Sequence, residues 1–156
     1  DAAQEPPGRA KGEVNANWLC LCDAANISRE GKLNLLGIFD FFTADALPAR
    51  FSFSVAGRAA LGKAGQHRIL LRIMEAVGGP VAEAGGTLTV ANDGAVGPVV
   101  FDFRSAEFVT PGSHVAALLL DGERVAQLPF EVRLVAAALV RPKLVLPGDG
   151  RAPLRR

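Results

Sequence analysis

Residues 51–56 read Phe-Ser-Phe-Ser-Val-Ala, and this short stretch decides the fold class. Its large apolar side chains, Phe51, Phe53 and Val55, alternate with small residues. Successive side chains of a β-strand point to opposite faces of the sheet. A period of two therefore predicts a strand with one face in the core and the other face outside it.

The same period recurs along most of the chain, between turns rich in Gly, Pro, Asn and Asp. About eight short strands at fairly even spacing predict an all-β, antiparallel two-sheet sandwich of the immunoglobulin-like type. Cys20 and Cys22 lie on one expected strand. The disulfide that joins the two sheets of an antibody domain is therefore absent, and the likeness is one of architecture only.

Three segments need a decision between alternatives. Residues 33–41 are expected to form one strand. Residues 66–76 alternate as a strand and also fit a helical spacing, but glycine turns on both sides favour the strand. The glycine pair at 85–86 predicts a break between two short elements, 81–84 and 87–91.

Composition divides the chain into three regions. Residues 1–16 are polar and rich in Pro, Gly and Ala, which predicts an extended arm. Residues 17–135 carry the strand pattern and form the expected β-sandwich domain. Residues 136–156 contain prolines, glycines and basic side chains that exclude a long regular element, and they predict a second extended arm.

Charge and hydropathy exclude several classes of protein. The 156 residues carry 17 Lys and Arg against 16 Asp and Glu, a net charge of +1 at pH 7, so no strong field attracts nucleic acid or anionic lipid. The longest apolar run, 134–140, is too short to cross a bilayer, and a soluble protein is expected. Two cysteines, expected as buried free thiols, favour a reducing, cytoplasmic compartment. Export stays open because the sequence begins with Asp1 instead of Met.

Groups able to perform catalysis are few. An enzyme needs a nucleophile with its base, a carboxylate pair or a metal cluster. His67 and His114 are the two histidines, and they would form a site only if the fold brought them together. Asp23, Asp40 and Asp102 lie at or near expected strand ends. Aspartates in such loops can bind calcium, but stabilisation of the turns explains these three more simply. The expectation is a protein with no enzymatic activity, no cofactor and no metal site.

Several motifs resemble a small bacterial domain family of unknown function. The motifs are Leu21-Cys22-Asp23, Gly-Lys-Leu-Asn-Leu-Leu-Gly-Ile-Phe-Asp at 31–40, Pro111-Gly112-Ser113-His114 and Leu120-Asp121-Gly122. The resemblance covers about residues 17–135, and the string at 31–40 is its most specific part. It implies a compact β-sandwich with no assigned activity, and it brings no catalytic residues.

These observations lead to the hypothesis of a non-enzymatic protein-interaction or structural module. It would be an accessory subunit of a larger bacterial assembly whose arms hold a partner protein. A homo-oligomer also stays open. The alternative is a sandwich that binds a small ligand, a carbohydrate or calcium through loops around Asp23, Asp40 and Asp93.

The residues expected to contact a partner come from one aromatic position and from the C-terminal arm. Phe42 cannot share a strand face with both Phe39 and Phe41, so either a bulge or an exposed contact must accommodate it. The arm offers a small apolar anchor among basic residues. The expected contact residues are Phe42, Arg141, Lys143, Leu144, Val145, Leu146, Arg155 and Arg156.

Overall fold

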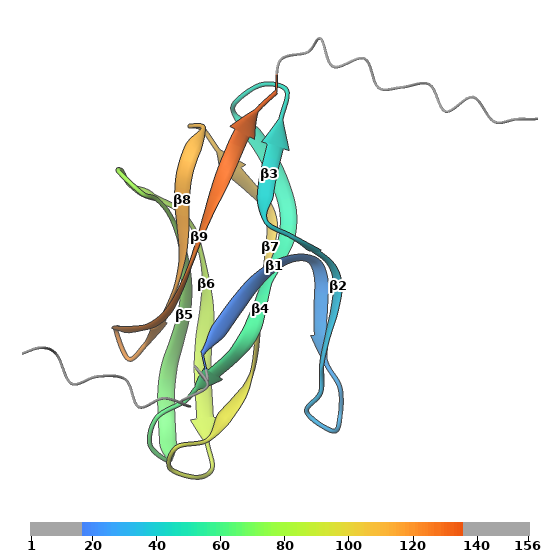
Figure 1. Ribbon diagram of the computed structural model, residues 1–156. Coiled ribbons are helices and arrows are strands. Elements are labelled where there is room, and N and C mark those ends of the chain that lie inside the picture. The colour runs from blue at the N-terminus through green and yellow to red at the C-terminus, as the bar shows by residue number, and fades with distance from the viewer. Residues whose placement is uncertain (1–16, 136–156) are drawn as a thin grey trace, which may run out of the picture.

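The computed structural model describes residues 17–135 and shows an all-β domain of nine strands in two sheets (Figure 1). Both expected arms, 1–16 and 136–156, lie outside the described residues. Within 17–135 no helix is present, so none is long and apolar enough to cross a membrane. The strands are β1 Trp18–Ile27, β2 Leu33–Phe39, β3 Phe41–Ala44, β4 Ala49–Ala60, β5 Gly65–Glu75, β6 Pro80–Val90, β7 Val96–Phe108, β8 Gly112–Leu120 and β9 Glu123–Leu134.

The two sheets enclose one hydrophobic core. Sheet A has the strand order β2-β1-β4-β7 and is antiparallel throughout. Sheet B has the order β3-β9-β8-β5-β6, and its pair β3–β9 is parallel. On one side the edge strands β6 and β7 contact each other. On the other side the chain passes from β2 in sheet A to β3 in sheet B through Asp40 alone.

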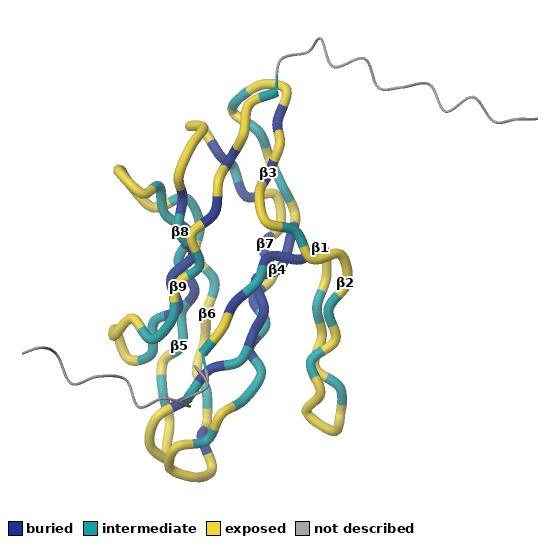
Figure 2. Tube along the Cα trace, viewed as in Figure 1, coloured by how far each residue is buried: buried dark blue, intermediate teal, exposed yellow. Residues whose placement is uncertain are grey.

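The core lies between the sheets, as the dark blue segments of Figure 2 show. Leu21, Val55, Leu71 and Leu118 are almost wholly buried there, and burial of each such side chain contributes about 1.5–3 kcal/mol. A group of aromatic rings fills one end of the core around Phe42. The ring centroids nearest to that of Phe42 are those of Phe51 at 4.8 Å, Phe53 at 4.9 Å, Phe39 at 5.0 Å, Phe108 at 5.1 Å and Phe130 at 5.6 Å.

Phe42 is a core residue with 5% of its surface exposed, so it leaves little surface for the partner contact expected of it. Asp40 divides the expected strand 33–41, so that Phe39 ends β2 in one sheet and Phe41 begins β3 in the other. The change of sheet resets the alternation and lets Phe39 and Phe42 both face the core. Phe41 is 41% exposed instead, with the guanidinium carbon of Arg133 3.7 Å from its ring centroid.

The two middle strands differ in how well the sequence predicted them. β5 is a strand, as the flanking glycine turns indicated. The expected break at 85–86 is absent, because β6 continues through both glycines. Gly85 pairs with Leu70 on β5, and a Cβ atom there would overlap the carbonyl oxygen of Ile69. The missing side chain allows close approach of the two strands and does not end the strand.

The two cysteines are free thiols on the face of β1 that points away from the core. Cys20 pairs with Ala56 and Cys22 with Ser54, so both project from the same side of the strand. Cys22 is fully buried, whereas Cys20 is only partly buried. Burial, reinforced by the neighbouring Cys20, raises the pKa of the Cys22 thiol to about 11. Cys22 is therefore protonated at neutral pH and unreactive.

Candidate functional site

A hairpin made of the second half of β1 and all of β2 projects from the side of the domain (Figure 1). Its turn is closed by backbone hydrogen bonds: Ser28 donates to the carbonyl of Lys32 at 2.8 Å, and Gly31 donates to that of Ser28 at 3.0 Å. Gly31 has a φ of +77°, a left-handed conformation that favours glycine. No residue from 23 to 39 is buried, and Figure 2 shows this hairpin as exposed or intermediate.

The hairpin is nevertheless a defined structure. The side-chain amide of Asn34 donates to the side-chain oxygen of Asn26 across the two strands, at 2.8 Å. Gly37 has a φ of +66°, and the space its side chain would fill is taken by the carboxyl group of Asp23. The pairing of β1 with β2 keeps one register from end to end, without a bulge.

β2 is an edge strand without the features that normally protect an edge. Charged residues, prolines, bulges and short length prevent edge strands from pairing with other chains. The seven residues of β2, Leu-Asn-Leu-Leu-Gly-Ile-Phe, include no charge and no proline. The other edges differ: β3 has four residues, while β6 and β7 carry prolines and charged residues and contact each other. β2 therefore pairs on one side only, with β1, and its other side has no strand partner within residues 17–135.

Large apolar side chains accompany this free edge. Leu36 is 69% exposed and Ile38 is 62% exposed. They pair with Ala24 and Cys22 of β1, which places both on the outer face of sheet A. Single exposed apolar side chains are common, but two neighbours beside an unprotected strand edge indicate a contact surface. We call residues 33–39, with Leu36 and Ile38 at their centre, the β2 edge.

His67 belongs to a clamp that holds two turns together at one end of sheet B. Asp121 and Gly122 form the β8–β9 turn with φ values of +50° and +85°, the signs expected of a type I′ hairpin turn. One carboxyl oxygen of Asp121 lies 2.6 Å from Nδ1 of His67, and the other accepts the backbone N–H of Arg68 at 2.8 Å. Nε2 of His67 lies 2.5 Å from the carbonyl oxygen of Lys63. Both ring nitrogens thus face acceptors, which suits the protonated imidazolium.

This clamp should make stability depend on pH. The hydrogen bond to Asp121, together with that to Lys63, raises the pKa of His67 above 6.5, and the bond from His67 lowers the pKa of Asp121 below 3.8. The His67 contribution is complete below pH 6.5 and is lost as pH rises through its raised pKa. The Asp121 contribution is complete above pH 3.8 and is lost as pH falls through its lowered pKa.

We therefore expect the difference in melting temperature between the wild type and His67→Gln to be largest from about pH 4 to 6.5 and to shrink above that range. Thermal unfolding of both proteins from acid to mildly alkaline pH measures this difference. A difference that stayed constant with pH would show that the ion pair contributes nothing to folding.

The second histidine is far from the first. His114 lies in the core between the rings of Phe108 and Phe130, with centroids at 5.4 and 5.5 Å, and its Nδ1 donates to the carbonyl of Gly112 at 2.9 Å. It pairs with Glu75, which lies eight residues along β5 from His67, or about 26 Å at 3.3 Å per residue. The fold does not bring the two histidines together.

The expected aspartates serve separate local roles. Asp102 accepts the hydroxyl of Ser54 at 2.5 Å, and Asp93 accepts the backbone N–H of Ala64 at 2.7 Å. Asp23 fills the space beside Gly37. In the described range 17–135, no three His, Cys, Asp or Glu side chains gather as metal ligands.

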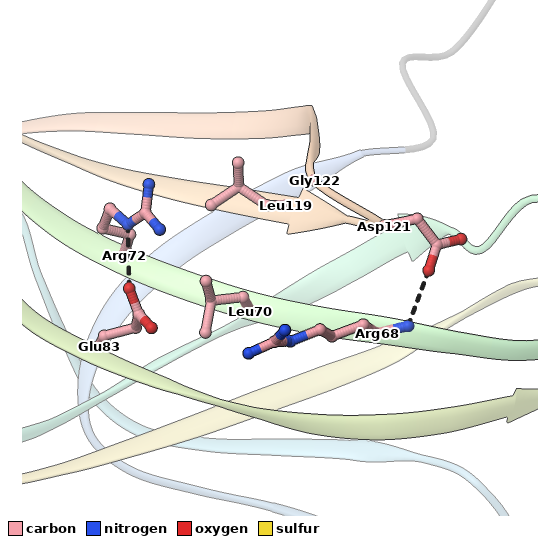
Figure 3. Close-up of a pocket in the computed structure, with 7 residues that line it drawn as sticks. All are labelled: Arg68, Leu70, Arg72, Glu83, Leu119, Asp121 and Gly122. Carbon is pink, nitrogen blue, oxygen red and sulfur yellow. Dashed lines mark hydrogen bonds and ion pairs between the residues drawn. The ribbon is translucent and has the colours of Figure 1, made fainter.

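Sheet B carries an open groove of about 560 Å³ on its outer face. Figure 3 shows Leu70 and Leu119 between the arginines and acidic residues that line it. Nε of Arg72 forms an ion pair with Glu83 at 3.0 Å, which occupies one end. None of the aspartates expected to hold a small ligand lines this groove, whereas Asp40 lines two other surface hollows, of about 340 and 150 Å³.

Reasoning from the sequence missed the β2 edge. The uncharged string at 33–39 was visible, but its position at the edge of a sheet depends on strand order. The predicted arm contacts fall outside the described residues. They are Arg141, Lys143, Leu144, Val145, Leu146, Arg155 and Arg156.

Comparison with protein families gives one match. A family described as a family of unknown function, DUF6941, matches residues 17–133. The chain belongs to this family. The match covers almost the same residues as the resemblance drawn from the sequence motifs, and it confirms a family of unknown function. No curated protein matches the DUF6941 chain.

Three solved structures that align with part of this chain belong to larger proteins. One is the alkylpurine DNA glycosylase AlkC of Pseudomonas fluorescens bound to DNA with an abasic site analogue, with a TM-score of 0.37 and 17% identity over 60% of this chain and 27% of that one. Two are structures of the β-glucosidase of Listeria innocua. The mutant with laminaribiose has a TM-score of 0.40 and 16% identity over 62% of this chain, and the complex with isofagomine has a TM-score of 0.40 and 14% identity over 76%.

The DUF6941 chain spans 27%, 15% and 16% of the lengths of these three chains. At such TM-scores the likenesses carry no argument about what the chain does.

Proposed function

We propose that this DUF6941 domain is a non-enzymatic protein-interaction module that receives an extended polypeptide segment at the β2 edge. The observation that carries the proposal is an edge strand of seven uncharged residues with Leu36 and Ile38 more than half exposed beside it. A segment added to a free edge gains main-chain hydrogen bonds, while pockets and side chains on alternate residues give specificity.

The contacts available at this edge are of the kind that supports binding. Each new main-chain hydrogen bond contributes about 0.5–1.5 kcal/mol. Covering the exposed parts of Leu36 and Ile38 adds about 1–2 kcal/mol each. Because the hairpin is already ordered by its turn and by the Asn34–Asn26 hydrogen bond, little conformational entropy is lost on the side of the domain.

The proposal includes the role of an accessory or structural subunit in a larger bacterial assembly. Residues 144–146 are apolar and stand among basic residues, which suits them for a second contact with the same partner. A domain with a free edge and two tails can hold a partner at more than one place, and linked contacts raise the effective affinity.

We also propose that the fold is a variant of the immunoglobulin-like sandwich. Support comes from strand order, since β1, β4 and β7 lie side by side in sheet A in the manner of strands A, B and E. β5, β8 and β9 are neighbours in sheet B in the manner of strands C, F and G. The β2 edge is then an addition to the side of sheet A.

Site-specific photo-crosslinking tests the function. A benzophenone amino acid at Leu36, in the full chain in the cells that produce it, should give a discrete crosslinked product with another polypeptide. The same amino acid at Val77, which is 95% exposed on the β5–β6 turn, serves as the control and should give none. Ile38→Lys should remove the product from the Leu36 position, because a charge on an edge opposes strand pairing. Equal products at both positions, or none at Leu36, would contradict the proposal.

A further inference from the structure

The β2 edge has a self-complementary sequence, which bears on what it receives. We infer that the incoming segment is β2 of a second copy of this chain, paired antiparallel about a two-fold axis at Leu36. This inference rests on the proposed function and names its partner. The two four-stranded A sheets would then form one continuous eight-stranded sheet.

The register follows from the geometry of strand pairing. Residues that lie opposite each other in an antiparallel pair have their side chains on the same face of the sheet. A shift of the two β2 strands by one residue is therefore excluded, because it would place an outer-face residue opposite an inner-face residue. One register pairs all seven residues of β2 with all seven of the second copy. In that register Leu33 lies opposite Phe39 of the second copy, and Leu36 lies opposite its own equivalent.

Charges on both sides of β2 fit the same register. Lys32 precedes the strand and Asp40 follows it, and both are exposed. Full overlap sets Lys32 opposite Asp40 of the second copy, and the two-fold axis repeats this contact at the other end. Neither side chain forms an ion pair within residues 17–135, so both are available. A shift by two residues toward the turn would oppose Asp40 with Glu30, a pair of like charges.

The exposed apolar side chains also meet in this register. The Leu36 side chains of the two copies face each other on the outer face of the joined sheet. Ile38 of each copy is a diagonal neighbour of Leu36 of the other, within the reach of long side chains. Four side chains that are individually exposed then form one apolar cluster.

A charge exchange tests the pairing. Sedimentation velocity of the full chain over a concentration series should show a reversible dimer. Lys32→Asp and Asp40→Lys should each raise the dimer dissociation constant about tenfold, because each turns two attractive contacts into repulsive ones. The double variant should return the constant to within about threefold of the wild type. A chain that stays monomeric, or a double variant as weak as the single ones, would overturn the inference.

Cysteine crosslinking tests the register independently. In a Cys20→Ser, Cys22→Ala background, which removes the thiol opposite position 38, Leu36→Cys should form an intermolecular disulfide, because opposite residues lie about 4.5–5.5 Å apart. Ile38→Cys is the matched control. Its two copies would lie four residues apart along the strands, about 13 Å, beyond the reach of a disulfide. Crosslinking of Ile38→Cys in place of Leu36→Cys would exclude this register.

Sedimentation velocity and photo-crosslinking together separate this inference from the proposed function. A monomeric chain whose Leu36 photo-crosslinks to a different polypeptide overturns self-pairing and leaves the β2 edge as a binding site. A monomeric chain without any photo-crosslink overturns both.

Discussion

Phe42→Ala is expected to lower the free energy of unfolding by about 4 kcal/mol, which corresponds to a fall of about 15 °C in melting temperature. The substitution removes a side chain that is only 5% exposed. Its ring centroid lies within 5.6 Å of the centroids of five other phenylalanine rings. The surrounding side chains come from both sheets, so the cavity cannot close without moving strands together. Urea denaturation followed by circular dichroism measures the change.

Phe41→Ala is the matched control for Phe42→Ala, since it removes the same ring from the adjacent residue. Phe41 is 41% exposed and contacts Arg133 through a cation–π interaction. We expect a loss of about 1 kcal/mol. Equal losses for the two variants would mean that the chain does not change sheets at Asp40.

Gly57→Ala is expected to destabilise the domain by about 3 kcal/mol, the upper end of the usual range for overpacking. Gly57 is buried and pairs with Leu19 on one side and Val99 on the other. A Cβ atom there would overlap the carbonyl oxygen of Trp18 and lie 3.0 Å from Cα of Leu19. These are backbone atoms of β1, so relief requires β1 to move away from β4. Thermal unfolding with the signal of Trp18, the single tryptophan, measures the effect.

Gly86→Ala provides the comparison for Gly57→Ala, because it is also a glycine inside a strand but has no heavy atom within 4 Å of the added Cβ. We expect a change within about 0.5 kcal/mol, and stabilisation is the expected sign because alanine restricts the unfolded chain. A large loss at Gly86 together with a small one at Gly57 would contradict the pairing of β1 with β4.

Alternation predicted most of the fold because it depends on residues close together in the sequence. The strand at 51–56 lies within β4, and the segment 66–76 is a strand with a face in the core. Two predictions were wrong, the break at 85–86 and the single strand over 33–41. Both depend on how a segment pairs with strands that are distant in the sequence. Continuation of β6 through Gly85 depends on the approach of β5, and the break at Asp40 depends on which sheet each half of 33–41 joins.

The candidate site was much less predictable than the fold. Phe42 stood out in the sequence because it did not fit the alternation of a single strand over 33–41. The structure has two strands there, separated at Asp40, and Phe42 fits the alternation of the second strand. The β2 edge was missed because nothing in a local sequence says which strand lies outermost. The composition of residues 33–39 shows only that such an edge would be unprotected.

The single residue that separates β2 from β3 also has a mechanical consequence. Phe39 is the last residue of the exposed strand, and its ring lies 5.0 Å from that of Phe42 in the centre of the aromatic group. Tension on the β2 edge would peel that strand from β1 one pair at a time until it reached Asp40. Beyond Asp40 the applied force would act on the packed rings of Phe39 and Phe42, and so on both sheets at the same time. The hairpin is therefore anchored at its base by the group of aromatic rings around Phe42.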